Sequence, residues 1–201
     1  MKKISTLAVL LLALPSAWAA GEDTYAEFKA MMDRSFKTTG IAPKHRMYQL
    51  DFQKACSQEE QPAKAEIARI EAEQMKTIRY PADGKYFGDW KQGEKIALSG
   101  RGLTWTDKTP HDNGGGCYNC HQMSRHEVSY GTIGPSLLEY ATVRGTNEES
   151  IKYTWGKIYN AKAFNACSNM PRNGDAEILT EQQMKHLMAF LFDPASPVNK
   201  K

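Results

Sequence analysis

One stretch of sequence decides the fold that we expect, and it reads Cys117-Tyr118-Asn119-Cys120-His121. Two thiols three positions apart can each add to one vinyl group of a haem, while the next residue offers its imidazole to the iron. The stretch therefore predicts one covalent haem c, attached through Cys117 and Cys120, with His121 as the proximal axial ligand.

Two other kinds of site use cysteines at this spacing. A zinc site would need a second pair of ligands, such as another C-x-x-C or an H-x-x-x-H, and the sequence contains neither. A thioredoxin-like redox pair would follow a strand in a β-α-β pattern, and the sequence shows no such pattern. Covalent haem is the chemistry that the motif favours.

The sixth position of such an iron is open, or filled by a methionine or a second histidine. Met170 is the strongest candidate because it lies in a loop between two expected helices, 49 positions after His121. Pro171 keeps Met170 extended, which helps to project its thioether. The side chains that fit less well are Met123, His126, Met184 and Met188, while His45, His111 and His186 stay open as alternatives.

A support for the His121 ring is expected in the run Gly131-Thr132-Ile133-Gly134-Pro135-Ser136-Leu137. The Gly-Pro pair marks a rigid turn, and the Pro135 carbonyl could accept a hydrogen bond from the ring nitrogen that does not face the iron. Such a bond would fix the orientation and tautomer of His121. A plain turn without this bond is the alternative.

Two further cysteines, Cys56 and Cys167, form an even pair. In an oxidising compartment such a pair is expected to form one disulfide. It would close a loop of roughly 110 residues and stabilise the fold by a few kcal/mol. The alternative is that Cys167, close to Met170, is a reactive thiol or an iron ligand.

The N-terminus has the three parts of a secretory signal peptide. Lys2 and Lys3 precede an apolar run over 7–14, and small residues follow, so cleavage is expected near Ala19 or Ala20. The apolar run is far shorter than the roughly 20 residues that span a bilayer. No later segment is apolar enough to span a membrane. The sequence therefore predicts a periplasmic protein without a membrane span.

Composition supports an ordinary globular protein of 201 residues, with 41% hydrophobic and 24% charged residues. The formal charge is +3, and removal of Lys2 and Lys3 with the leader would leave about +1. Nucleic-acid binding is not expected, because it requires a strongly basic patch.

We expect a mainly α-helical protein, because runs of alternating β-branched residues are absent. The chain divides into a signal peptide over 1–20, a helical extension over 21–88 and a monohaem cytochrome domain over 89–201. Thr180 and Gln183 predict a capping box at the start of the last helix. The loop over 106–116 contains Gly114-Gly115-Gly116, which is expected to let the backbone approach the porphyrin. Helices are expected over 44–60, 63–78, 89–102, 147–160 and 181–192.

The order of these motifs resembles the class I cytochrome c fold over residues 89–193, with C-x-x-C-H, then Gly-Pro-x-Leu, then Met-Pro before a C-terminal helix. Longer runs resemble the SoxX family, the small cytochrome subunits of the SoxAX complexes of bacterial sulfur oxidation. These runs are Cys120-His121-Gln122, the run over 131–137, Asn165-Ala166-Cys167-Ser168-Asn169-Met170-Pro171-Arg172, Leu179-Thr180-Glu181-Gln182-Gln183 and the tail Asp193-Pro194-Ala195-Ser196-Pro197-Val198.

The resemblance implies a periplasmic heterodimer with a SoxA-like subunit. Such a complex is an L-cysteine S-thiosulfotransferase, which couples thiosulfate oxidatively to a cysteine of the carrier SoxYZ. This chain would accept the released electrons through a haem ligated by His121 and Met170, and pass them to a downstream cytochrome. The thiosulfate-handling cysteine of the family belongs to SoxA, so no catalytic residue is expected here. The alternatives are a free-standing periplasmic electron carrier and a haem sensor or gas-binding protein.

Overall fold

The computed structural model describes residues 20–100, 102–107 and 114–200, with the side chains from residue 24 onward. The expected signal peptide, apart from Ala20, and the alternative ligand His111 lie outside the described residues. The chain divides into two compact units, residues 1–37 and residues 38–201, which are treated separately below.

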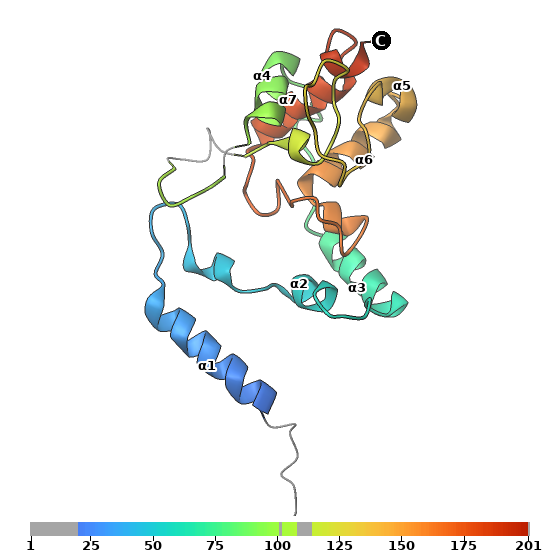
Figure 1. Cartoon of the computed structure of the whole chain (residues 1–201). Helices are drawn as coiled ribbons and strands as arrows, with labels where there is room; N and C mark the ends of the chain where they lie inside the picture. Colours follow the sequence, from blue (N-terminus) through green and yellow to red (C-terminus); the bar gives the residue numbers. More distant parts are fainter. Residues whose placement is uncertain (1–19, 101, 108–113, 201) are drawn as a thin grey trace, which may run out of the picture. The chain divides into compact units, whose positions relative to one another are not determined.

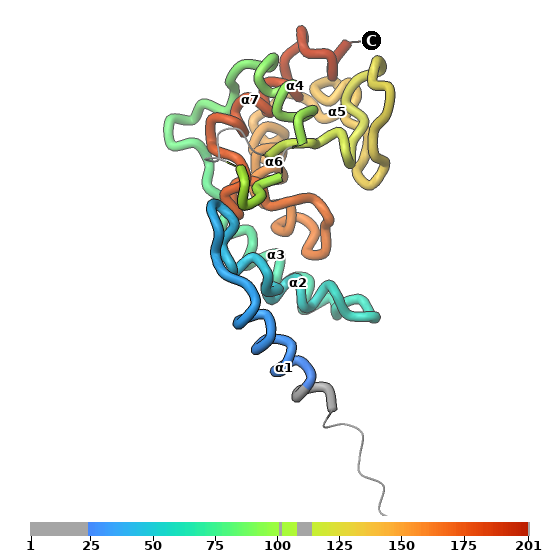
Figure 2. Tube along the Cα trace, turned by 60° about the vertical axis from the view of Figure 1, so that its left-hand side comes forward, coloured from blue at the N-terminus to red at the C-terminus, as the bar shows by residue number. Residues whose placement is uncertain are grey.

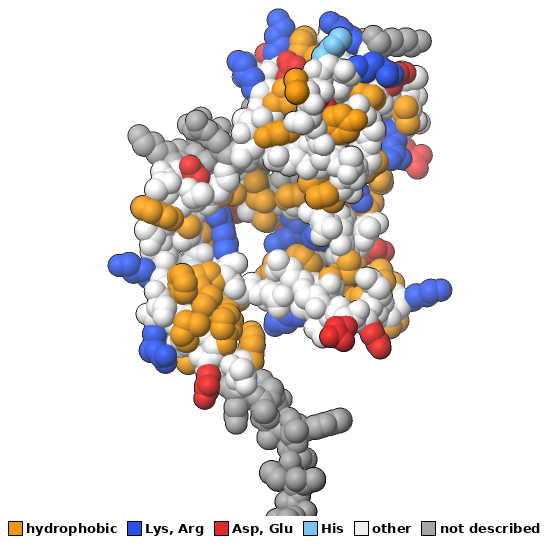
Figure 3. Space-filling view, in the orientation of Figure 1, with side chains coloured by type: hydrophobic (Ala, Val, Ile, Leu, Met, Phe, Trp, Pro, Cys, Tyr) orange, Lys and Arg blue, Asp and Glu red, His pale blue; other side chains and the backbone are white. Residues whose placement is uncertain are grey.

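The described part of the first unit is built around helix α1 (Ala20–Ser35). Large apolar side chains are exposed on it and just after it, as the orange atoms over α1 in Figure 3 show. Tyr25 and Phe28 contact each other through their rings, whose centroids are 6.4 Å apart. Lys29 and Asp33 form an ion pair of 2.8 Å one turn apart. The sequence pattern indicated helical character in this region without singling out this helix.

The regular elements of the second unit are all helices, joined by loops, and its described residues contain no β-strand (Figure 1). Thr39 and Ala42 form an isolated bridge. The expectation of a mainly α fold is therefore confirmed. Its elements are η1 (Lys44–Met47), α2 (Asp51–Cys56), α3 (Lys64–Met75), α4 (Trp90–Ser99), η3 (Cys117–Asn119), α5 (Tyr140–Arg144), α6 (Glu148–Tyr159), η4 (Ala161–Ala163), α7 (Glu181–Phe192) and η5 (Pro197–Asn199).

The later helices begin and end where local sequence signals place them. Helix α7 has the expected bounds, and the capping box of Thr180 and Gln183 is present at its start. Asn147 caps α6 by accepting a hydrogen bond from the Ser150 amide at 2.8 Å. Gly100 ends α4 in the left-handed conformation, with φ of 55°, which glycine adopts without steric cost.

The helix expected over 44–60 is wrong as a continuous element. The structure divides it into η1 and α2, with an extended segment around Leu50, whose φ and ψ are −75° and 163°. The Gln53 side chain accepts a hydrogen bond from the Leu50 amide at 2.8 Å. This side-chain bond satisfies a backbone donor at the start of α2, so the helix can restart there.

Helices α4 and α7 pack closely and lie side by side in both views (Figure 1, Figure 2). Gly93 permits this contact, because a Cβ atom at that position would lie 2.1 Å from the His186 carbonyl oxygen. The main core gathers around α7, where Met188 and Phe190 are almost fully buried, together with Trp155 of α6. The helix that precedes Cys117 therefore packs against the helix that follows Met170.

Residues before α4 pack on this core within the same unit. The Trp155 indole donates a hydrogen bond to the Arg79 carbonyl at 2.8 Å. The side-chain Nδ2 of Asn160 donates a hydrogen bond to Gln74 Oε1 at 3.0 Å. A second, smaller core cluster contains Phe52, Ile70 and Ala166. Helices α2 and α3 are thus tied to the segment just before Met170. Among the helices described, none is long and apolar enough to cross a membrane.

Candidate functional site

A single turn of chain carries the C-x-x-C-H motif. Cys117 begins the short helix η3, and its carbonyl accepts hydrogen bonds from the amides of Cys120 at 3.0 Å and His121 at 2.9 Å. Gly116 precedes the turn with φ of 66°, a left-handed conformation that favours glycine. One hydrogen-bonded turn therefore carries both cysteines and the histidine of the motif.

The glycines before the motif make close contacts with the rest of the chain. The cavity beside His121 is not lined by Gly114, Gly115 or Gly116. A Cβ atom on Gly115 would lie 1.8 Å from the Ile96 carbonyl oxygen, and the Gly116 amide donates a hydrogen bond to that oxygen at 3.1 Å. These glycines therefore let the loop approach α4.

The His121 ring is held by the bond that the Gly-Pro pair predicted. Its Nδ1 lies 2.7 Å from the Pro135 carbonyl oxygen. A carbonyl can only accept, so Nδ1 must carry the proton, and Nε2 of the neutral ring keeps its lone pair. The arrangement therefore presents Nε2 as a ligand for a metal.

The segment over 131–137 runs against the segment over 118–122 and fixes this geometry. Backbone hydrogen bonds join Gly131 to Tyr118 at 2.8 Å, Gly134 to Cys120 at 2.8 Å and Leu137 to Gln122 at 2.7 Å. Gly134 lies directly against the imidazole, because a Cβ atom there would be 2.2 Å from His121 Cε1. The ring is therefore confined by both the glycine and the proline of the turn.

A Gly134→Ala substitution is expected to displace the His121 ring. The added methyl would overlap the imidazole, and overpacking of this kind costs about 1–3 kcal/mol. Thermal unfolding measures the loss, with Gly102→Ala as the matched control, because a Cβ atom at Gly102 meets nothing within 4 Å. Equal stability of the two variants would show that the turn adapts without pressing on His121.

One cavity of about 470 Å³ brings most of the predicted site residues together. Its size falls within the range of pockets for small molecules and cofactors. The sequence-predicted residues on its lining are Cys120, His121, Pro135, Cys167 and Met170. The apolar residues on its lining are Ile133, Leu137, Tyr140, Ile158 and Leu191. An imidazole and a thioether thus share a largely apolar cavity.

Met170 is half-buried against the main core cluster. Its amide donates a hydrogen bond to the Ser168 hydroxyl at 3.1 Å, and its carbonyl accepts one from Lys162 Nζ at 3.3 Å. The loop backbone around Met170 is therefore held by polar contacts, while the side chain is in apolar surroundings.

Cys117 is not on the lining of this cavity. The residue as a whole is half-buried, and burial of its thiol raises its pKa to about 11. The thiol is therefore neutral at neutral pH, whereas reactive thiols of C-x-x-C redox pairs have lowered pKa values. Within the described ranges, no group of three or more His, Cys, Asp or Glu side chains could hold a metal ion.

The alternative histidine ligands that the structure describes lie elsewhere. His186 accepts a hydrogen bond from the Asp89 amide at 2.8 Å through Nδ1 and contacts Gln182 through Nε2. His45 is part of η1. Neither residue lines the cavity. Met184 and Met188 are buried in the core of α7.

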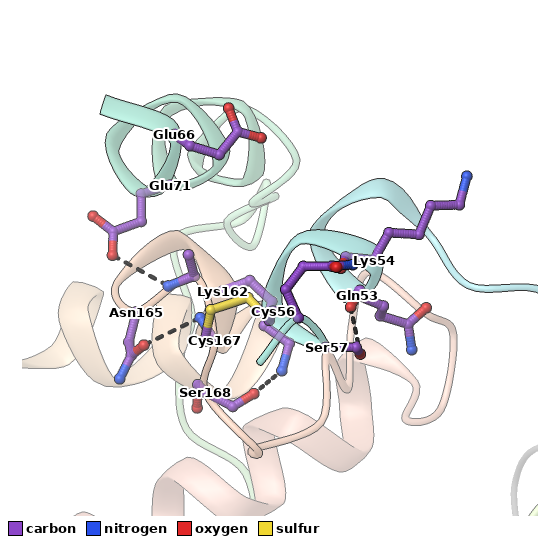
Figure 4. Close-up of a disulfide and its surroundings, with 12 residues drawn as sticks. Gln53, Lys54, Cys56, Ser57, Glu66, Glu71, Lys162, Asn165, Cys167 and Ser168 are labelled. Atoms are coloured by element: carbon purple, nitrogen blue, oxygen red, sulfur yellow. Dashed lines mark hydrogen bonds between the residues drawn. A yellow bond between two sulfur atoms is a disulfide. The ribbon is translucent and has the colours of Figure 1, made fainter. Parts of the chain in front are cut away.

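The expected disulfide between Cys56 and Cys167 is confirmed, with 5.4 Å between the two Cα atoms (Figure 4). It joins the last residue of α2 to the loop that carries Met170. Cys167 therefore has no free thiol, and its alternative roles as a reactive thiol or an iron ligand are wrong for this structure.

No protein-family model matches the sequence. The chain is similar to a protein of Aquifex aeolicus (strain VF5) described as an uncharacterized lipoprotein. The two are 37% identical over 152 residues, which cover 74% of this chain and 72% of the relative. The chain belongs to the family of this lipoprotein. Because the relative is uncharacterized, the family brings no activity to this chain.

Two cationic side chains on the lining of the cavity were not predicted from the sequence. Arg144 ends α5 and Lys157 lies on α6, and both line the cavity. Burial lowers the pKa of Lys157, an effect that Arg144 reinforces and Glu71 opposes. The one signal in the sequence was the position of Lys157 between two apolar residues, Trp155 and Ile158. Their positive charges make the cavity suitable for an anionic group.

Proposed function

We propose that the chain is a monohaem c-type cytochrome whose iron is ligated by His121 and Met170. The observation that carries this proposal is the shared cavity, whose lining includes both the imidazole of His121, fixed through Nδ1, and the thioether of Met170. Thioether bonds to Cys117 and Cys120 would anchor the group. A haem held in this way stores one electron at its iron, at a potential tuned by its ligands and surroundings.

The other cavity residues are chemically suited to this cofactor. The apolar lining suits a porphyrin. Arg144 and Lys157 offer positive charge for the two propionate carboxylates of a haem. The packing of α4 against α7 is also consistent with the class I cytochrome c fold, in which a helix before the attachment motif and a C-terminal helix frame the haem.

We further propose that this cytochrome is the electron-accepting, SoxX-like subunit of a thiosulfate-oxidising complex. The support is the resemblance of five sequence runs, two of which supply the Pro135 turn and the Met170 loop. A SoxA-like subunit would handle thiosulfate and SoxYZ would carry the product, while this chain passes electrons to a downstream cytochrome. A free-standing electron carrier is the second candidate, because it requires the same residues of this chain.

A periplasmic location fits this proposal. The leader over 1–20 predicts export, and a disulfide between Cys56 and Cys167 is stable in an oxidising compartment. Haem attachment to C-x-x-C-H likewise takes place outside the cytoplasm.

Reconstitution tests the proposed role. The purified haem protein is expected to show no thiosulfate oxidation by itself, and to support turnover with SoxYZ and an electron acceptor once a SoxA-like partner is added. A pull-down from the source organism should recover that partner. Full activity of the chain alone would contradict the division of roles, and failure to bind any SoxA-like protein would favour the free-standing carrier.

A further inference from the structure

We propose that helices α2 and α3 are a brace that positions Met170 and so keeps the sixth coordination site closed. The positioning residues are Cys56, Cys167 and Glu71. This inference rests on the proposed haem ligation and assigns a role to part of the segment before the cytochrome domain. It follows from the way in which the loop over 165–171 is fastened.

The first fastening is covalent. The disulfide joins Cys167, three positions before Met170, to Cys56, 111 positions earlier in the chain (Figure 4). Cys56 is the last residue of α2, whose Phe52 is buried in the second core cluster. A packed helix therefore limits the distance that the loop can move from its position.

The second fastening comes from α3. Glu71 Oε1 accepts a hydrogen bond from the Ala166 amide at 3.1 Å (Figure 4). Ala166 is only 1% exposed, so water does not reach its backbone amide. Without Glu71 this amide would be buried with no hydrogen-bond acceptor, which costs roughly 1–3 kcal/mol of stability. The Asn165 side chain accepts a further hydrogen bond from the Cys167 amide at 3.2 Å. Ala166 is therefore held by Glu71 from the segment before the haem domain, while the bond from Cys167 to Asn165 stiffens the loop from within.

The third fastening comes from within the domain. Lys162 of η4 donates hydrogen bonds to the carbonyls of Ser168 and Met170. Lys162 Nζ also lies 5.7 Å from the centroid of the Phe52 ring, and the Arg172 guanidinium lies 5.0 Å from it. Phe52 of α2 therefore contacts cations on both sides of Met170.

These fastenings matter because the loop is not packed solidly from behind. A second cavity, of about 480 Å³, is lined by Phe52, Cys56 and Met170. Space of this size leaves the loop room to move away from His121. The disulfide and Glu71 are therefore needed to hold the thioether in place, since continuous packing does not.

Two variants of the full-length haem protein test the brace. Glu71→Gln weakens the bond to the Ala166 amide, and Cys56→Ser with Cys167→Ser removes the covalent tie. Both are expected to keep wild-type covalent haem content. Both should lose intensity in the near-infrared thioether-to-iron band, and the reduced proteins should bind carbon monoxide about tenfold more readily than wild type.

Glu66→Gln is the matched control, because Glu66 lies on the same helix and its carboxylate pairs with Arg69 on the exposed surface. It should behave as wild type. If the double serine variant fails to accumulate, Glu71→Gln decides alone. Variants whose band and carbon monoxide binding equal those of wild type would overturn the brace while leaving the haem assignment intact. A wild-type protein with haem but without the thioether band would overturn both proposals.

Discussion

A chain in which Cys117 and Cys120 are both replaced by serine is expected to leave the export and haem-attachment pathway with no covalent haem. Serine hydroxyls do not form thioethers, and the two sulfurs are the points at which the proposed haem would be held. Haem staining after denaturing electrophoresis, together with the intact mass, measures the loss directly. This is the largest effect that we expect from any substitution in the chain.

The second cysteine pair provides the control. A Cys56→Ser, Cys167→Ser chain also lacks two cysteines, but those two form the disulfide, so it should retain the haem. Single Cys117→Ser and Cys120→Ser variants should bind haem through one thioether or be degraded. If the double Cys117, Cys120 variant still carried haem on denaturing gels, the attachment site would have to be elsewhere.

Apart from the disulfide, the features that could be predicted from sequence depend on short-range chemistry. The capping box of Thr180 and Gln183 fixes the start of α7 within four residues. The support of His121 by Pro135 spans 14 positions and follows from a turn signal. The disulfide could be predicted because two of the four cysteines remained after the haem motif was assigned. Two cysteines in an oxidising compartment are expected to pair with each other.

The features that sequence reasoning missed depend on contacts between distant segments. Glu71 and Ala166 are 95 positions apart, and an isolated glutamate on an exposed helical pattern gives no sign of such a partner. Arg144 and Lys157 lie on two different helices, α5 and α6, which both contact α7, and this packing brings the two cations onto the lining of one cavity. The helix expected over 44–60 breaks around Leu50, whose amide donates a hydrogen bond to the Gln53 side chain. The spacing of the apolar residues alone predicts an uninterrupted helix there.

Met170→Ala is expected to keep its covalent haem and to lose the sixth ligand. The attachment turn around Cys117 is separate from the Met170 loop, so haem content should not change. Loss of the thioether should abolish the near-infrared ligand band, open the reduced iron to carbon monoxide, and shift the reduction potential by on the order of 0.1 V. Absorption spectra and a redox titration measure these three changes.

Met188→Ala separates the ligand role from the effect of losing a methionine. Met188 is fully buried in α7, so its truncation should destabilise the fold by about 2–5 kcal/mol while leaving the ligand band unchanged. Met170 is only half-buried, so truncation there should cost less stability and change the spectrum more. A Met170→Ala protein that retains the band would assign the ligand to another methionine, and the sixth site would then have to be formed outside the cavity that His121 and Met170 share.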